Sequence, residues 1–529
     1  MKRICFLFVL CLICSLANAE EVEIEGINYR LFDGNKAEVI SKSGGYIGDI
    51  VIPSTITVET TDYNVIQIRQ EAFGYNRELT SISIPNSISL IDANAFRDCS
   101  MLSAVYINDL KAWCNILFEG SIYGWTNPLS YAHHLFLNGE EIKELIIPEG
   151  VTTINAYSFY GMSELTSIYF PSSVVEVGSL AFEKCNNISK IIINDIGAWC
   201  NIKFTKSAWT GAISNPLSVA RHLYLNEEEI KDLIIPGEIA DINNYVFQGC
   251  ESIESITFHD GVKSIGINAF CGCSNVEKLD LPSSLTSIKD GAFQGLNLVK
   301  ELNIPEGVTS IGNIAFSGLT SLTSITWPTS LESIGDNSFS RCINITALNI
   351  PDNVTSIGEG AFNRCEGLVT INLPNNLSRI SSYLVCDCYN LISIDIPESV
   401  TSIGNYAFQN CRSLTSVKIP QKVETIGEYA FYECSSLVTV DMSEVENLKR
   451  IWHHAFQNCT KMNTLYFPKK LIDINNFVFA NCRSLTSLDF PENLEGIGEY
   501  AFEGCNGITT VEIPNSVIAI NEAAFSKCI

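Results

Sequence analysis

Cysteine is the residue type best able to do chemistry in this 529-residue sequence, which contains 20 of them. Three residues after a recurring phenylalanine stand Cys99, Cys185, Cys250, Cys273, Cys342, Cys365, Cys388, Cys411, Cys434, Cys459, Cys482, Cys505 and Cys528. Other units place Asn76, Met162, Leu296 or Leu319 there, which indicates an apolar, buried column. We therefore predict buried free thiols. The alternative is a series of disulfides between stacked units, although a stacking step of ~4.8 Å exceeds the ~3.8 Å that disulfide Cβ atoms prefer.

The other polar residues match no catalytic or metal-binding pattern. The six histidines form no H-E-x-x-H or Cys-His zinc spacing, and the additional Cys271 and Cys386 lack a two-residue gap and a paired partner. No nucleophile elbow and no phosphate-binding glycine loop is present. The acidic runs Glu140–Glu141 and Glu227–Glu229 lie at predicted turns, where solvated charge is the expected interpretation. We predict no catalytic residue, no cofactor and no metal, and therefore no enzyme. A hydrolase would need an acid/base pair that the sequence does not reveal.

The segments that position these residues repeat every 23 residues. The period is marked by Pro282, Pro305, Pro328, Pro351, Pro374, Pro397 and Pro420. It is marked again by Phe73, Phe96, Phe159, Phe182, Phe247, Phe270, Phe293, Phe316, Phe339, Phe362, Phe408, Phe431, Phe456, Phe479, Phe502 and Phe525, with Val385 in one place, which makes 17 units. A repeat of this length is typical of a stacked array.

Each position of a unit has a physical role. In LISIDIP (391–397), apolar and polar residues alternate, as in a half-buried strand that ends at the proline. A second short apolar stretch follows at Val400 to Ile403. Four residues before the phenylalanine, 13 of 17 units have Gly, Asn or Asp, which predicts a tight left-handed corner. The stretch around Ala407–Phe408 predicts a single helical turn whose phenylalanine fills the core.

One such unit cannot bury its own apolar face, but stacked units cover each other. Seventeen of them predict a β-rich solenoid on the order of 80 Å long, at ~4.8 Å per coil. A surface of this kind is large and has no closed pocket, which favours a function in contact with another molecule.

The pattern in Leu414 to Cys434, LTSVKIPQKVETIGEYAFYEC, resembles the BspA-like, Treponema-type leucine-rich repeat and recurs over residues 76–529. Residues 20–75, with GINYRL and GGYIGDIVIPSTI, resemble the N-terminal β-rich cap of that family. The resemblance implies an α/β-type leucine-rich repeat solenoid: a curved, single right-handed superhelix of 23-residue coils with short strands and single helical turns. It also implies an exported surface protein, since members include adhesins for host matrix proteins or other microbes.

The first residues predict export. Residues 1–19 have a basic start, an apolar run and the small-x-small pattern Ala17-Asn18-Ala19, which together are typical of a signal peptide cleaved after Ala19. No later segment is long and apolar enough to predict a membrane span. The formal net charge of −26 argues against nucleic-acid partners. We expect a secreted or cell-surface monomer. No anchoring or sorting segment is recognised after the last unit, so the mode of attachment is left open.

Two related inserts, at 108–147 and 194–235, interrupt the period and predict loop-and-hairpin lobes at the edge of the solenoid. Both contain NPLS and a Trp-Cys pair. The shared Trp, Cys and His predict either a ligand site or, as we prefer, tryptophan anchors at Trp113 and Trp199. Between the matching parts lies a variable tract with Trp125 in one insert and Trp209 in the other. Because exposed aromatic loop residues often carry recognition, these two are candidate partner-binding residues. A plain variable loop tip is the alternative.

In each unit, the outward positions of the strand that ends at the proline form another candidate surface. Asn349, Asn372 and Asp395 stand two residues before successive prolines and predict a flat polar column suited to a long, shallow partner. An ordinary solvated sheet face explains the same pattern. The favoured function is an exported, non-enzymatic, adhesin-like protein that binds a host matrix or microbial surface protein or glycan. The alternative is a structural spacer or self-associating rod without a specific ligand.

Overall fold

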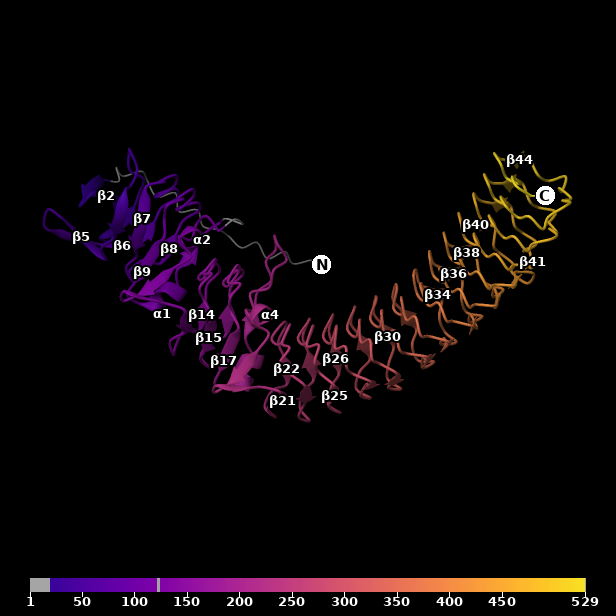
Figure 1. Cartoon of the computed structure of the whole chain (residues 1–529), viewed down its shortest axis with the longest axis horizontal. Helices are drawn as coiled ribbons and strands as arrows, with labels where there is room; N and C mark the ends of the chain where they lie inside the picture. The colour runs from indigo at the N-terminus through magenta and orange to yellow at the C-terminus, as the bar shows by residue number, and fades with distance from the viewer. Residues whose placement is uncertain (1–19, 121–123, 529) are drawn as a thin grey trace, which may run out of the picture. The chain divides into compact units, whose positions relative to one another are not determined.

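The computed structural model describes residues 20–120 and 124–528, so the predicted signal peptide lies outside the described residues. The chain divides into two compact units. Figure 1 labels helices and strands along the chain. Unit 1 comprises Met1–Ile188 and Thr205–Pro216, and unit 2 comprises Ser189–Phe204 and Leu217–Ile529. Each is a stack of coils in which short parallel strands pair with the equivalent strands of the next coil.

Unit 1 begins with the segment predicted to be a cap. Its elements are β1 (Glu21–Ile24), β2 (Ile27–Phe32), β3 (Lys36–Val39), β4 (Gly48–Val51), β5 (Thr55–Val58) and β6 (Thr61–Ile68). Strands β1, β2 and β3 pair antiparallel in that order, and β5 pairs antiparallel with β6. Strand β3 pairs parallel with β6, and β6 pairs parallel with β8 (Leu90–Ile91), so the parallel stacking starts here.

The coils of unit 1 continue from this start. Their elements are β7 (Leu79–Ser83), β9 (Ala104–Ile107), α1 (Leu110–Cys114), β10 (Leu117–Phe118), α2 (Leu129–Ala132), β11 (Leu135–Leu137), β12 (Glu140–Glu141), β13 (Glu144–Ile146), β14 (Thr153–Ile154), β15 (Ser167–Phe170) and β16 (Glu176–Val177). Strands β4, β7, β9 and β11 form one parallel column, and β6, β8 and β10 form the other.

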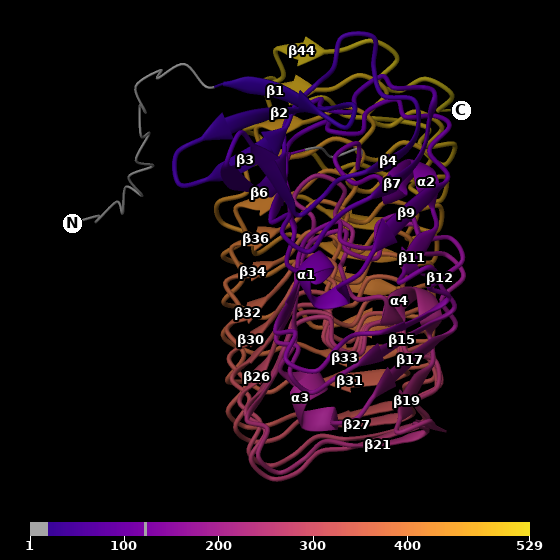
Figure 2. The same ribbon diagram turned by 90° about the vertical axis from the view of Figure 1, so that its left-hand side faces the viewer.

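Unit 2 has the same two columns of strands (Figure 2). One column holds β17 (Lys190–Ile193), β19 (Leu223–Leu225), β21 (Asp232–Ile234), β23 (Ser255–Thr257), β25 (Lys278–Asp280), β27 (Glu301–Asn303), β29 (Ser324–Thr326), β31 (Ala347–Asn349), β33 (Thr370–Asn372), β35 (Ser393–Ile394), β37 (Ser416–Lys418), β39 (Thr439–Asp441) and β41 (Thr464–Tyr466). It is interrupted, because its sheets contain two or three strands of these coils each.

The other column is more continuous. It holds β22 (Asp241–Ile242), β24 (Ser264–Ile265), β26 (Ser287–Ile288), β28 (Ser310–Ile311), β30 (Ser333–Ile334), β32 (Ser356–Ile357), β34 (Arg379–Ile380), β36 (Ser402–Ile403), β38 (Thr425–Ile426), β40 (Arg450–Ile451), β42 (Asp473–Ile474), β43 (Gly496–Ile497) and β44 (Ala519–Ile520), in sheets of six and seven strands. Unit 2 also contains α3 (Ile196–Cys200), β18 (Lys203–Phe204), α4 (Leu217–Ala220) and β20 (Glu228–Glu229).

The alternation predicted for the first strand is present. In β31, Ala347 and Asn349 are exposed while Leu348 is buried, and Leu348 pairs with Ile371 and then Ile394 along the column. A step of 23 residues therefore places equivalent apolar side chains on top of one another. This arrangement confirms the predicted solenoid of 23-residue coils.

The phenylalanines form the spine of the core. Phe316, Phe339 and Phe362 are fully buried, and their rings stack with centroids 5.3 and 5.9 Å apart. Around Phe408, Gln409 N donates to Tyr406 O and Cys411 N donates to Phe408 O, which gives a single tight turn with i→i+3 bonds. The Phe408 N–H itself donates to Ala430 O of the next coil at 2.8 Å.

The left-handed corner predicted four residues before the phenylalanine is wrong. Gly404, Asn243 and Asn475 do not have a positive φ. Glycine is needed at this position for a different reason. A Cβ at Gly404 would lie 2.5 Å from Ser382 N of the neighbouring coil. The left-handed residues stand two before and two after the phenylalanine, as at Tyr406 (φ 58°) and Asn410 (φ 59°).

Replacing Phe339 by Ala should lower the free energy of unfolding by about 3–5 kcal/mol, because it empties a buried position between two stacked rings. Urea denaturation followed by circular dichroism measures the effect. The exposed Glu301→Ala change in β27 is the matched control and should leave the midpoint nearly unchanged. Equal effects of the two substitutions would contradict the phenylalanine spine.

Candidate functional site

The predicted strand-face residues gather in one shallow hollow of unit 2. Asn349 and Asn372 end β31 and β33, and Asp395 follows β35. All three are exposed and line a hollow of about 640 Å³. The structure therefore brings the three predicted positions together, while their role in binding stays a prediction.

The hollow is rich in hydrogen-bond acceptors. Besides Asp395, Asp352 and Glu398 contribute carboxylates, and none of the residues that line it is basic. Asn372 Nδ2 donates to Asn349 Oδ1 at 3.3 Å, and Asn375 N donates to Asp352 Oδ1 at 3.1 Å. These contacts hold the polar side chains in rows along the stack. The arrangement suits a partner that brings N–H or O–H donors or positive charge.

The two variable-tract tryptophans occupy different environments. Trp125 is half-buried, with the Arg97 guanidinium 4.5 Å from its ring centroid, and its carbonyl accepts a bond from Phe96 N. Trp209 is 78% exposed in a short hairpin closed by the Lys206–Ile213 bridge. The expectation of an exposed aromatic side chain is therefore met at Trp209 and not at Trp125. Arg97 covers the ring of Trp125, an arrangement that the sequence spacing did not reveal.

The tryptophan shared by the inserts is an anchor, as predicted. Trp113 is 1% exposed and its Nε1 donates to Ser158 O at 2.8 Å. In unit 2, Trp199 is equally buried and donates to Val246 O at 2.8 Å. Each tryptophan sits on a short helix that begins at an aspartate, and the Asp109 side chain accepts from Ala112 N at 3.0 Å.

The shared Trp, Cys and His do not converge on one ligand site. Cys114 is fully buried beside Trp113, whereas the side chain of His134 is 40% exposed and its Nδ1 lies 2.5 Å from Glu141 Oε1. This hydrogen bond is the main cause that lowers the pKa of the Glu141 carboxyl. The pair closes the β11–β12 hairpin, whose turn has positive φ at Asn138 and Gly139, as is typical of an Asn-Gly turn.

The first insert also supplies regular strands to unit 1. Strand β10 pairs parallel with β8, and β11 pairs parallel with β9. Residues 108–147 therefore form an enlarged coil with a hairpin added to it, and the anchor tryptophan lies inside that coil. In unit 2, β19 pairs with β17 and carries an equivalent hairpin to β20.

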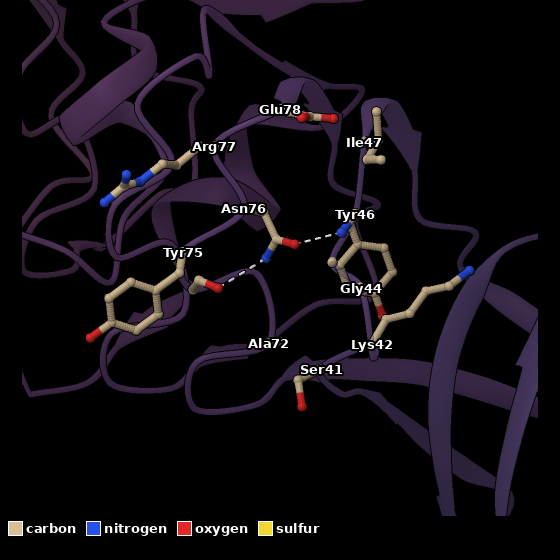
Figure 3. A pocket seen from close by; sticks show the side chains of 12 residues that line it. Ser41, Lys42, Gly44, Tyr46, Ile47, Ala72, Tyr75, Asn76, Arg77 and Glu78 are labelled. Carbon is tan, nitrogen blue, oxygen red and sulfur yellow. Dashed lines mark hydrogen bonds between the residues drawn. The ribbon is translucent and has the colours of Figure 1, made fainter.

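A second hollow, of about 460 Å³, lies in unit 1 between residues 41–47 and 72–78 (Figure 3). Asn76 occupies the cysteine position there, accepts from the backbone N–H of Tyr46 and donates to Gly74 O at 3.1 Å. An amide can make both bonds, whereas a thiol makes weak ones. Asn76 thus ties the start of the stack to the first coil, which gives it a structural role.

In the described residues the cysteines of the column are free thiols, and all of them except the partly exposed Cys528 are buried. Cys411 Sγ donates to Val385 O and Cys434 Sγ donates to Phe408 O, each one coil back. The thiol is thus a small apolar group that also satisfies a buried carbonyl. Burial raises the pKa of Cys99 and Cys365 from 9.0 to about 12, which makes these thiols poor nucleophiles. Residues 20–120 and 124–528 include no group of three or more His, Cys, Asp and Glu that could hold a metal ion.

Sequence reasoning missed an aromatic ladder two residues before the phenylalanine column. It consists of Tyr383, Tyr406, Tyr429, His454, Phe477 and Tyr500, stacked with centroids 4.4–4.9 Å apart. These residues have a left-handed backbone conformation. This conformation costs an L-residue roughly 1 kcal/mol or more. Ring stacking offsets part of that cost. The signal was available in the sequence, since three tyrosines recur at a step of 23.

These coils define the class of protein, a leucine-rich repeat solenoid. The model of the BspA type leucine rich repeat region matches residues 46–123, 131–208, 218–346, 291–414, 332–463 and 401–529, and the chain belongs to this family. The comparison with curated proteins gives no match. In the described residues, no helix has the length and hydropathy needed to cross a bilayer.

Several solved leucine-rich repeat structures are similar to this chain, and three of them are bacterial. A leucine-rich repeat protein from Bacteroides ovatus is 22% identical, with 94% of this chain and 95% of that chain covered and a TM-score of 0.44. A leucine rich cell surface protein from Faecalibacterium prausnitzii is 21% identical, with 80% and 94% covered and a TM-score of 0.35. The pneumococcal vaccine antigen PcpA is 16% identical, with 86% and 93% covered and a TM-score of 0.34.

Thiol titration tests the cysteine column. The chain cleaved after Ala19 should show 17 reactive thiols in denaturant, with or without reductant, because all 17 cysteines of the described residues are free. In the native protein only the partly exposed Cys271 and Cys528 should react readily. A denatured count well below 17 without reductant, restored to 17 by reductant, would contradict the column of free thiols.

Alkaline pH should destabilise the protein. The folded state holds the thiol protons up to about 12, whereas the unfolded chain releases them near 9.0, so stability is lost as pH rises through this window. The urea midpoint should therefore fall between pH 9 and pH 12. The variant Cys365→Leu should show a smaller fall of the urea midpoint with pH. Leucine suits this position, since Leu319 stands at the equivalent place in another coil. An identical slope in this variant would show that other groups cause the loss.

Proposed function

We propose that this protein is an exported, adhesin-like recognition protein that binds a protein or glycan outside the cell. The observation that carries the proposal is the hollow at Asn349, Asn372 and Asp395, where three successive coils present fixed polar groups to solvent. Catalysis needs convergent groups in a site that excludes water, and this open face offers instead a broad contact area.

Two sequence features support the location. Residues 1–19 are typical of a signal peptide, and family membership agrees with a role at the bacterial surface. A formal net charge of −26 disfavours nucleic acid and anionic lipid, and favours partners with positive or donor-rich surfaces. The partner class is therefore a host matrix or microbial surface protein, or a glycan with many hydroxyl groups.

Trp209 is a second contact point under the same proposal. Its indole is 78% exposed on a hairpin, where an aromatic side chain can bury a large area on a partner. For Trp125, a contact with a partner requires the Arg97 side chain to move away, since the guanidinium covers its ring.

The triple variant Asn349→Ala, Asn372→Ala and Asp395→Ala should weaken capture by about tenfold or more, because it removes the polar groups of one hollow from three coils. Surface plasmon resonance of the chain cleaved after Ala19, against purified matrix proteins and a glycan array, measures the loss.

The matched control lies in the same column of strands. Asp280, Asn303 and Thr326 are exposed at the equivalent positions of three preceding coils, and their alanine triple should retain affinity. Equal losses in the two triples would place the contact elsewhere. Absence of binding to every member of the panel would contradict the proposal and favour the structural-spacer alternative.

A further inference from the structure

Trp452 interrupts a regular row of unit 2. It stands four residues before Phe456, a position at which 13 of 17 units have Gly, Asn or Asp. The residue follows β40 directly and its side chain is 40% exposed. Trp452 is therefore the one aromatic residue in a row that mostly holds glycine, asparagine or aspartate in the 17 units.

The residues that precede Trp452 in this row are glycines. A Cβ on Gly404 would lie 2.5 Å from Ser382 N, and one on Gly427 would lie 2.7 Å from Asn405 N, so close packing of the coils requires glycine. Both glycines and Trp452 line a shallow hollow of about 430 Å³.

Polar groups line the rest of this hollow, which we call the Trp452 hollow. Ser402 and Thr425 lie on β36 and β38, neighbouring strands of one sheet. Asn405 and Glu428 lie just beyond the glycines. Asn405 Oδ1 accepts from Glu428 N at 2.9 Å, so its Nδ2 is the group left to donate to a ligand. The hollow thus offers hydroxyl groups, an amide donor and a carboxylate acceptor within two coils.

This combination fits a sugar better than a peptide. A pyranose has an apolar C–H face and a rim of hydroxyl groups, and its partly positive hydrogens are attracted to the negative face of an aromatic ring. A hydrophobic peptide side chain needs an apolar pocket, but the aliphatic lining residue Ile403 is only 1% exposed. Glu428 is the one charged residue in the lining, and it disfavours anionic saccharides.

We propose that the Trp452 hollow binds a neutral saccharide, with one sugar ring against Trp452 and its hydroxyl groups bonded to Asn405, Glu428 and Thr425. This inference rests on the proposed recognition function and assigns to it a second site and a ligand class. It does not involve the hollow at Asn349, Asn372 and Asp395.

The test uses the chain cleaved after Ala19 and neutral tetrasaccharides, namely cellotetraose, maltotetraose, mannotetraose and chitotetraose, titrated by isothermal calorimetry. At least one should bind. Trp452→Ala should weaken that binding by about tenfold or more, and Trp452→Phe by less, because a smaller ring keeps part of the stacking. Glu428→Gln should weaken it through the lost acceptor charge.

Tyr466→Ala is the matched control, since Tyr466 is also an exposed aromatic residue of unit 2 (52%) but lies in the other column of strands, on β41. It should retain saccharide binding. Retained binding in Trp452→Ala, failure of all four tetrasaccharides, or competition by a proline-rich peptide would overturn the saccharide assignment. The Asn349, Asn372 and Asp395 triple separates the two proposals: it should keep saccharide binding while losing the partner captured by the broad face.

Discussion

A single coil of this protein cannot cover its own apolar face, and the solenoid strands of one coil pair with those of the next coil. The buried ring of Phe339, for example, stacks with the rings of the coils before and after it. Backbone groups also bond to neighbouring coils. Phe408 N donates to Ala430 O of the next coil, and Phe408 O accepts from Cys434 Sγ. Stability in such an array is a sum of contacts between neighbours. A position that suits one coil must therefore suit the coil above it, which explains the strict 23-residue repeat.

This dependence on neighbours also explains residues whose local preferences are not met. Tyr406 has a left-handed backbone that a tyrosine in isolation avoids, and the stacked Tyr383 and Tyr429 compensate. Gly404 has an ordinary backbone but no room for a Cβ against the coil before it. In both cases the cause lies 23 residues away in sequence and one coil away in space. Neither cause is visible in the chemistry of a single unit.

In such a molecule, function depends on the polar and aromatic side chains that the repeating surface exposes to solvent. The buried cysteine thiols are unreactive, since burial keeps them protonated. The exposed rows, in contrast, arrange the same polar position of successive coils side by side, as at Asn349 and Asn372. Departures from the repeat add individual features to these rows. Trp209 on its hairpin and Trp452 beside two glycines are such departures, and both expose an indole.

The sequence by itself determined the period, the buried phenylalanine and cysteine columns, the outward polar column and the anchoring role of Trp113. The columns follow from residue type at a regular spacing, and the role of Trp113 follows from the tryptophan that the two inserts share. Only the tertiary structure decided the left-handed positions, the aromatic ladder, the cover of Arg97 over Trp125 and the hollow beside Trp452. These depend on distances between atoms of different coils, where a shift of one ångström separates a contact from a clash, and residue spacing does not specify such distances.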